Sequence, residues 1–133
     1  MMPLLFLVAA SADLDALNQA VARCDRPTAN PVFAAEAGRR SQFLIDAYKE
    51  QEAVVNARVD VATQRQALKE AGTHPASADL KALDLQDSAL DARMKALNDR
   101  RSLEAAREQA MDAMRHYFLL NCPAGGPEPK VAR

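Results

Sequence analysis

The feature that most constrains this chain is a turn midway between its two cysteines. The turn, residues 72–77, reads Gly-Thr-His-Pro-Ala-Ser, and Cys24 and Cys122 each lie 49 residues from Thr73. A chain that folds back at this turn would bring both cysteines to the open end of an antiparallel helical hairpin. In an exported protein we expect them to form a structural disulfide. The alternative is two unrelated buried thiols in a cytosolic protein.

The composition favours helices that pack in thin layers. The chain has 133 residues, of which 49% are hydrophobic and 26% charged, as in a single folded domain. Alanine and leucine supply most of the apolar residues and tryptophan is absent, which favours helices over a thick sheet core. A formal net charge of −1 provides no basic field for phosphates, so we expect no nucleic-acid partner.

Residues 1–12 form an uncharged apolar stretch that ends in Ala10-Ser11-Ala12, a pattern typical of signal-peptidase sites. We therefore expect a signal peptide and a periplasmic or secreted mature protein. The usual basic residues are missing, so either the peptide is truncated at its start or the stretch is a buried N-terminal helix of a cytosolic protein. It is much shorter than the ~20 residues of a membrane-spanning helix, and we expect no transmembrane segment in the mature chain.

Capping signals predict three helices, at about 13–24, 31–71 and 77–120. Asn30 followed by Pro31 predicts an N-cap, Gly72 predicts a C-cap, and Ser77 predicts the next N-cap. Residues 123–133 are rich in proline and glycine, so we expect a disordered tail.

The predicted fold class is all-α. We expect one domain over residues 13–122, built as a long, coiled-coil-like antiparallel hairpin of two helices. The short N-terminal helix is expected to pack at the open end.

Apolar spacing predicts which faces of the two long helices meet. In 31–71 an approximate 11-residue repeat aligns two columns, namely Phe33, Leu44, Val55 and Ala37, Tyr48, Val59. In 77–120 the spacing is heptad-like, through Leu80, Leu83, Leu90, Met94 and Leu97, and it then drifts to Leu103, Ala110 and Met114.

The cysteines also predict the register of the hairpin. If they face each other, Leu44 meets Leu103, Tyr48 meets Leu97 and Val55 meets Leu90. The same register predicts the exposed ion pairs Asp46–Arg100 and Arg58–Asp87, each contributing at most ~1 kcal/mol.

No residue pattern predicts catalytic, cofactor-binding or metal-binding sites. His74 and His116 are too far apart along the predicted hairpin to share a metal, and no histidine or cysteine cluster supplies the remaining ligands of zinc. Nucleophile motifs and glycine-rich phosphate loops are also missing. We therefore expect a protein that is not an enzyme.

Arginines gather toward the predicted open end and define a possible interaction patch. Guanidinium groups suit carboxylate and phosphate partners. A solvated helix face with internal ion pairs is the alternative. The patch consists of Arg39, Arg40, Arg100, Arg101 and Arg107.

These expectations favour a non-enzymatic exported protein with a structural or protein–protein interaction role in the cell envelope. A hairpin of two helices leaves much of each helix uncovered, so we expect self-association or a protein partner. One alternative is a periplasmic holdase-like chaperone or assembly factor. Another is a small secreted enzyme inhibitor that presents either the turn at 72–77 or the loop expected at 26–30.

Overall fold

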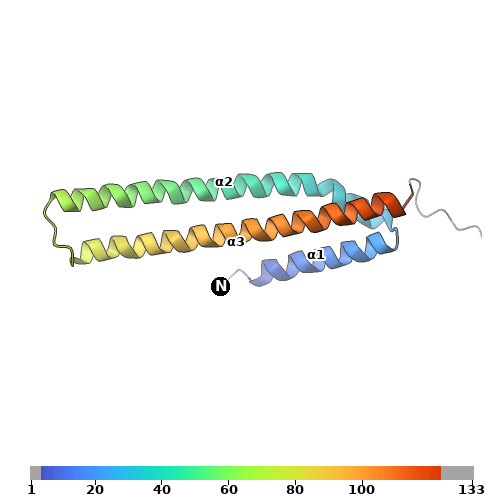
Figure 1. Cartoon of the computed structure of the whole chain (residues 1–133), viewed down its shortest axis with the longest axis horizontal. Helices are drawn as coiled ribbons and strands as arrows, with labels where there is room; N and C mark the ends of the chain where they lie inside the picture. The colour runs from blue at the N-terminus through green and yellow to red at the C-terminus, as the bar shows by residue number, and fades with distance from the viewer. Residues whose placement is uncertain (1–3, 124–133) are drawn as a thin grey trace, which may run out of the picture. The chain divides into compact units, whose positions relative to one another are not determined.

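The computed structural model describes residues 4–123, with side chains from residue 13 onward, and this part of the chain forms three helices. They are α1 (Leu4–Ala22), α2 (Arg26–Glu70) and α3 (Ala78–Asn121) (Figure 1). No strand occurs in this range, which confirms the all-α class. The predicted signal-peptide cleavage position after Ala12 lies inside α1, and the signal peptide stays a prediction. Beyond Pro123 the predicted tail lies outside the described residues.

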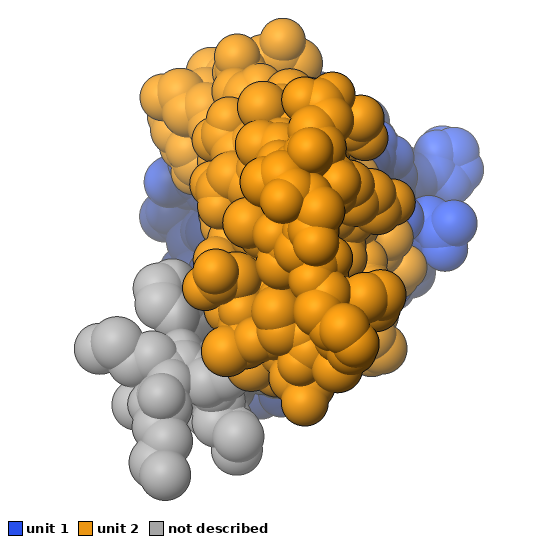
Figure 2. Space-filling view, turned by 90° about the vertical axis from the view of Figure 1, so that its left-hand side faces the viewer, with its two compact units in different colours: residues 1–41, 105–133 blue, residues 42–104 orange. Residues whose placement is uncertain are grey.

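The chain divides into two compact units, coloured separately in Figure 2. Unit 1 comprises residues 1–41 and 105–133, and unit 2 comprises residues 42–104. Because α2 and α3 extend through both, each unit contains part of each long helix.

In unit 2, the segment of α2 before the connecting turn packs against the segment of α3 after it, as expected of a hairpin. The apolar cluster between them contains Val54, Val61, Leu80, Leu83 and Leu90, which are all at most 8% exposed. The hydrophobic effect of burying this row holds the two helix segments together.

The connecting turn is stabilised by the capping residues that the sequence predicts. Gly72 has a φ of 73°, and its N–H donates to the carbonyl oxygen of Lys69 at 3.0 Å. The N–H of Thr73 donates to the carbonyl oxygen of Leu68 at 3.0 Å, which completes a Schellman motif. Ser77 caps α3, which begins at Ala78, and its Oγ accepts the N–H of Leu80 at 3.3 Å.

The predicted 11-residue repeat of α2 is wrong as a description of its buried face. Leu44 and Tyr48 are 66% and 67% exposed. The buried residues are instead Ala47, Val54 and Val61, which recur every seven residues. The prediction placed the larger apolar residues at the contact, whereas the face of α2 that packs on α3 consists of smaller side chains.

On α3, the burial of the side chains agrees with the predicted apolar row as far as Leu97. Leu80, Leu83, Leu90 and Leu97 are buried, and Met94 is half-buried. The predicted continuation to Leu103 is wrong, since this side chain is 51% exposed.

The ion pairs predicted from the cysteine register do not form. Arg58 pairs with Asp91 at 2.6 Å rather than with Asp87, and Asp46 accepts a hydrogen bond from Gln42 at 2.9 Å. Asp87 pairs with Arg65 at 2.7 Å. Cys24 lies before α2, which begins at Arg26, so the cysteines do not report the facing positions of α2 and α3.

Unit 1 combines α1 with the start of α2 and the end of α3. Leu17, Ala20 and Val21 of α1 are at most 2% exposed, and they share a cluster with Met111 and Phe118 of α3. Phe33 of α2 packs on this cluster, with its ring centroid 5.7 Å from that of Phe118.

The predicted start of the second helix at Pro31 is wrong, because α2 begins five residues earlier, at Arg26. Asp25, not Asn30, caps it, with its carboxylate accepting the Thr28 N–H at 3.3 Å and the Thr28 hydroxyl at 2.7 Å. Pro31 removes one helical hydrogen bond but lies on the exposed side, while the neighbouring Ala29 is fully buried in unit 1. The loop expected at 26–30, and with it one possible inhibitor loop, is therefore replaced by helix.

Candidate functional site

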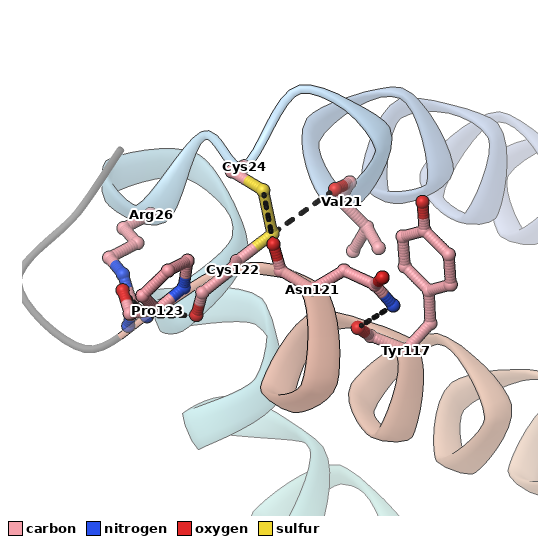
Figure 3. Close-up of a disulfide and its surroundings, with 7 residues drawn as sticks. All are labelled: Val21, Cys24, Arg26, Tyr117, Asn121, Cys122 and Pro123. Carbon is pink, nitrogen blue, oxygen red and sulfur yellow. Dashed lines mark hydrogen bonds between the residues drawn. A yellow bond between two sulfur atoms is a disulfide. The ribbon is translucent and has the colours of Figure 1, made fainter. Parts of the chain in front are cut away.

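The two cysteines meet in unit 1, where they connect the α1–α2 junction to the end of α3 (Figure 3). Their sulfur atoms are 2.00 Å apart and their Cα atoms 5.4 Å apart. This confirms that Cys24 and Cys122 lie at disulfide distance. Cys122 is 2% exposed and belongs to the apolar cluster of unit 1, so the bridge is part of the core.

Cys24 also forms the C-terminal cap of α1. Its φ is 53°, its N–H donates to the Val21 carbonyl at 3.1 Å, and the Asp25 N–H donates to the Ala20 carbonyl at 2.8 Å. This is the Schellman pattern that Gly72 forms at the end of α2, but here a residue with a Cβ occupies the left-handed position. The backbone conformation at Cys24 is consequently strained.

Arg26 fastens the end of α3 from the first turn of α2. Its guanidinium donates to the carbonyl oxygens of Cys122 and Pro123 (Figure 3). The guanidinium carbon also lies 5.1 Å from the centre of the Phe118 ring. The cation thus satisfies carbonyl groups that the helix end leaves without partners.

Glu36 is a buried carboxylate surrounded by three arginines of unit 1. It is 7% exposed, and its oxygens lie 2.7 Å from Arg39, 3.5 Å from Arg40 and 3.5 Å from Arg107. Burial alone would raise the pKa of Glu36. The hydrogen bonds and charges of Arg39 and Arg107 outweigh burial, so the pKa lies below its usual range.

The structure divides the predicted arginine patch between the two units. Arg39, Arg40 and Arg107 gather at Glu36 in unit 1. Arg40 also pairs with Glu108 and Asp112, at 3.4 and 3.1 Å. These charges are thus largely compensated within unit 1.

The other two arginines of the patch belong to unit 2. Arg101 donates to the amide oxygen of Gln51 at 2.5 Å. Glu50 accepts a hydrogen bond from Arg93, which is the main reason that the pKa of Glu50 is lowered, and the charge of Arg100 adds to this effect. A binding role for the five arginines stays a prediction.

Two shallow pockets accompany these ion pairs. One lies beside Glu36 and Arg40 and holds about 80 Å³, and the other lies beside Arg58 and Arg65 and holds about 180 Å³. Both are smaller than the ~300 Å³ at the lower end of small-molecule sites.

The histidines have separate local environments. His74 lies in the turn, where its Nδ1 accepts the N–H of Ala76 at 3.0 Å, and His116 is exposed on α3. Within the described part of the chain, no group of three or more histidine, cysteine or acidic side chains is arranged to hold a metal ion.

The residues of the mispredicted repeat form an exposed apolar stripe on α2 in unit 2. We call the four residues Leu44, Tyr48, Val55 and Val59 the α2 stripe, and they are 66%, 67%, 47% and 58% exposed. At 100° per residue they fall within about 60° of the helix circumference. Their centre lies about 110° from the row that packs on α3. The α2 stripe is therefore a second apolar face, which the hairpin itself does not cover.

Two charged residues lie beside the α2 stripe, near its midpoint along the helix axis. At 100° per residue, Glu52 lies about 50° and Lys49 about 110° from the centre of the stripe, both on the same side of it. Lys49 and Glu52 are both exposed and have no ion-pair partner among the described residues. They contrast with Arg58 and Arg65, whose charges are engaged by aspartates of α3.

Comparisons with known proteins do not identify a relative. No protein-family profile, no curated protein and no solved structure shows significant similarity to this chain. None of the helices in the described residues is both long enough and apolar enough to span a bilayer.

Sequence reasoning missed the burial of Glu36 and misplaced the α2 stripe. Acidic and basic residues three and four positions apart, at Glu36, Arg39 and Arg40, are a signal for a local ion pair. The contribution of Arg107, 71 positions away, could not be found from spacing. The apolar spacing of the stripe is visible in the sequence, but the predicted repeat places it on the face of α2 that packs against α3.

Proposed function

We propose that this chain is a non-enzymatic protein–protein interaction protein of an exported compartment, and that it docks a helix through the α2 stripe. The observation that carries the proposal is the exposure of Leu44, Tyr48, Val55 and Val59 on one side of α2. Full burial of a side chain of this kind contributes about 1.5–3 kcal/mol. An apolar row at helical spacing is suited to pairing with another helix.

The scaffold of this surface is a coiled-coil-like hairpin. Buried residues recur at seven-residue spacing in Ala47, Val54 and Val61 of α2 and in Leu83, Leu90 and Leu97 of α3. Ion pairs flank these rows, as in Arg93–Glu50 at 2.9 Å and Arg65–Asp84 at 2.9 Å. With its own contact face occupied by α3, α2 presents the stripe as a preformed surface.

The cysteine pair supports the exported location. Disulfides persist in the periplasm and outside the cell, whereas the reducing cytosol keeps thiols free. The mass of the native protein with and without reductant tests this part of the proposal. We expect a difference of two hydrogens, together with an N-terminus at Asp13 if the signal peptide is cleaved.

Site-specific photo-crosslinking in intact cells that naturally produce the protein tests the docking surface. A photoreactive residue at Tyr48 is expected to give a reproducible covalent adduct, which mass spectrometry then identifies. The control position is Gln64, which is exposed on α2 but lies about 170° from the centre of the stripe. Equal adduct formation at both positions, or none at Tyr48, would contradict the proposed function.

A further inference from the structure

The spacing of the α2 stripe is the same in both directions along the helix. Leu44 and Tyr48 are four residues apart, Tyr48 and Val55 seven, and Val55 and Val59 four. An antiparallel copy of α2 therefore places Leu44 opposite Val59 and Tyr48 opposite Val55, twice each. The two larger side chains, Leu44 and Tyr48, each meet a valine.

We infer that the α2 stripe binds the α2 stripe of a second copy of this chain, antiparallel, about a two-fold axis that passes between Gln51 and Glu52. This inference rests on the proposed function, since it specifies the partner of the same surface. A two-fold contact of this kind uses one patch on both protomers and closes at the dimer.

The charges beside the midpoint of the stripe are arranged to complement those of a second copy across this axis. At the rim of the contact, the long side chain of Lys49 of one copy can reach toward Glu52 of the other, and symmetry repeats the pair. Both residues have no ion-pair partner among the described residues, so the second copy supplies the opposite charge to each. The two Glu52 carboxylates approach each other at the axis, and the two lysines offset their repulsion.

The size of the contact sets the expected affinity. From Leu44 to Val59 the stripe is ~22 Å long at 1.5 Å per residue, and one helix meeting one helix over this length forms a small interface. We expect a dissociation constant on the order of 10–100 µM. The dimer should therefore form reversibly and depend on protein concentration.

Sedimentation of the purified, oxidised full chain tests the dimer. The weight-average mass is expected to rise from monomer toward dimer as the concentration rises to the order of 500 µM. Tyr48→Glu should weaken the dimer at least about tenfold, because it places a carboxylate opposite Val55. Leu85→Glu is the matched control, since Leu85 is 73% exposed on α3, and this variant should dimerise like the unaltered protein.

Engineered cysteines test the antiparallel register. A mixture of Leu44→Cys and Val59→Cys proteins should cross-link in air as the mixed dimer, faster than either protein alone. Circular dichroism and the mass of the intact Cys24–Cys122 bridge check that each variant is folded. The inference is overturned by a strict monomer at the highest concentration, by equal effects of Tyr48→Glu and Leu85→Glu, or by preferential Leu44–Leu44 cross-links.

The two proposals fail in different ways. A monomer in solution whose Tyr48 position still captures a different protein in cells overturns the dimer and leaves the docking function intact. Absence of any Tyr48 adduct in cells overturns the docking function, even if purified protein dimerises at high concentration.

Discussion

Cys24 has two tasks that place opposite demands on its side chain. As the C′ residue of α1 it adopts a φ of 53°, where glycine is favoured, and as a disulfide partner it needs the Cβ and Sγ that glycine lacks. The bridge to Cys122 therefore holds a backbone conformation that costs about 1 kcal/mol in a residue with a Cβ.

This strain predicts an unusual ranking of two variants that lack the disulfide. Cys24→Gly combined with Cys122→Ala should be more stable than Cys24→Ala combined with Cys122→Ala, by about 1 kcal/mol. Urea unfolding followed by circular dichroism measures the difference. An equal or greater stability of the alanine form would show that residue 24 leaves the left-handed region once the sulfur bond is gone.

The Glu36 carboxylate predicts a stability effect that depends on pH. Glu36→Gln removes the charge that compensates Arg39, Arg40 and Arg107, and we expect it to lower the free energy of unfolding by about 2–4 kcal/mol at neutral pH. Glu108→Gln is the control. The Glu108 side chain is 51% exposed, and Arg40 is its ion-pair partner among the described residues, so we expect a loss below ~1 kcal/mol.

The direction of the pH dependence follows from the lowered pKa of Glu36. A carboxyl group with a lower pKa in the folded than in the unfolded state stabilises the fold above the unfolded value of about 4.5, and this contribution is lost as the pH falls through the folded pKa. Unfolding free energies measured from pH 7 downward should converge for Glu36→Gln and the unaltered protein below pH 4.5. A constant difference across this range would contradict the assignment.

The second helix shows which parts of this fold were accessible from the sequence. Its C-cap at Gly72, the Ser77 cap of α3 and the apolar row of α3 as far as Leu97 follow from local chemistry, and these are found. The face of α2 that packs on α3 could not be predicted from the sequence. Ala47 and Val54 define one apolar face, Leu44 and Tyr48 define another, and only the position of α3 decides which of the two is buried. The start at Arg26 was likewise hidden, since tertiary packing of Ala29 overrides the local preference of Pro31.

Two neighbouring valines of α2 test this reassignment. Val54 is fully buried and Val55 is 47% exposed, so the same substitution probes the two faces. Val54→Ala should lower the free energy of unfolding by about 2 kcal/mol, and Val55→Ala by less than ~0.5 kcal/mol. Chemical denaturation is measured at low micromolar protein, where self-association does not add to stability. A larger loss for Val55→Ala than for Val54→Ala would instead support the 11-residue repeat as the buried face of α2.

The part of the chain with described side chains, residues 13–123, combines two apolar clusters, one in each unit, with the covalent closure between Cys24 and Cys122. The cluster of unit 1 includes Cys122, whereas the cluster of unit 2 contains only residues of α2 and α3. The disulfide joins residues 98 positions apart and so encloses all of α2, the turn and α3. Loss of the disulfide should increase the conformational entropy of the whole unfolded chain. In the folded chain it should loosen chiefly the packing of unit 1.

Reduction of the disulfide tests this distinction. In the chain-entropy account, opening a loop of this length lowers the free energy of unfolding by about 4–5 kcal/mol. Hydrogen exchange of the reduced protein under native conditions should show lost protection in residues 13–22 of α1, while amides around Val54 and Leu97 keep theirs. A variant with both cysteines replaced by alanine controls for direct effects of the reductant. An unchanged denaturation midpoint on reduction would contradict the prediction.

The covalent connection between residues 24 and 122 also determines how the chain carries mechanical load. A pulling force applied between the two ends of the polypeptide enters through α1 and leaves through the sulfur–sulfur bond to Cys122. The 97 residues between the cysteines lie outside this force path. While the bridge is intact, tension on the termini can peel α1 away from the α2 and α3 segments of unit 1, but it cannot pull α2 and α3 apart.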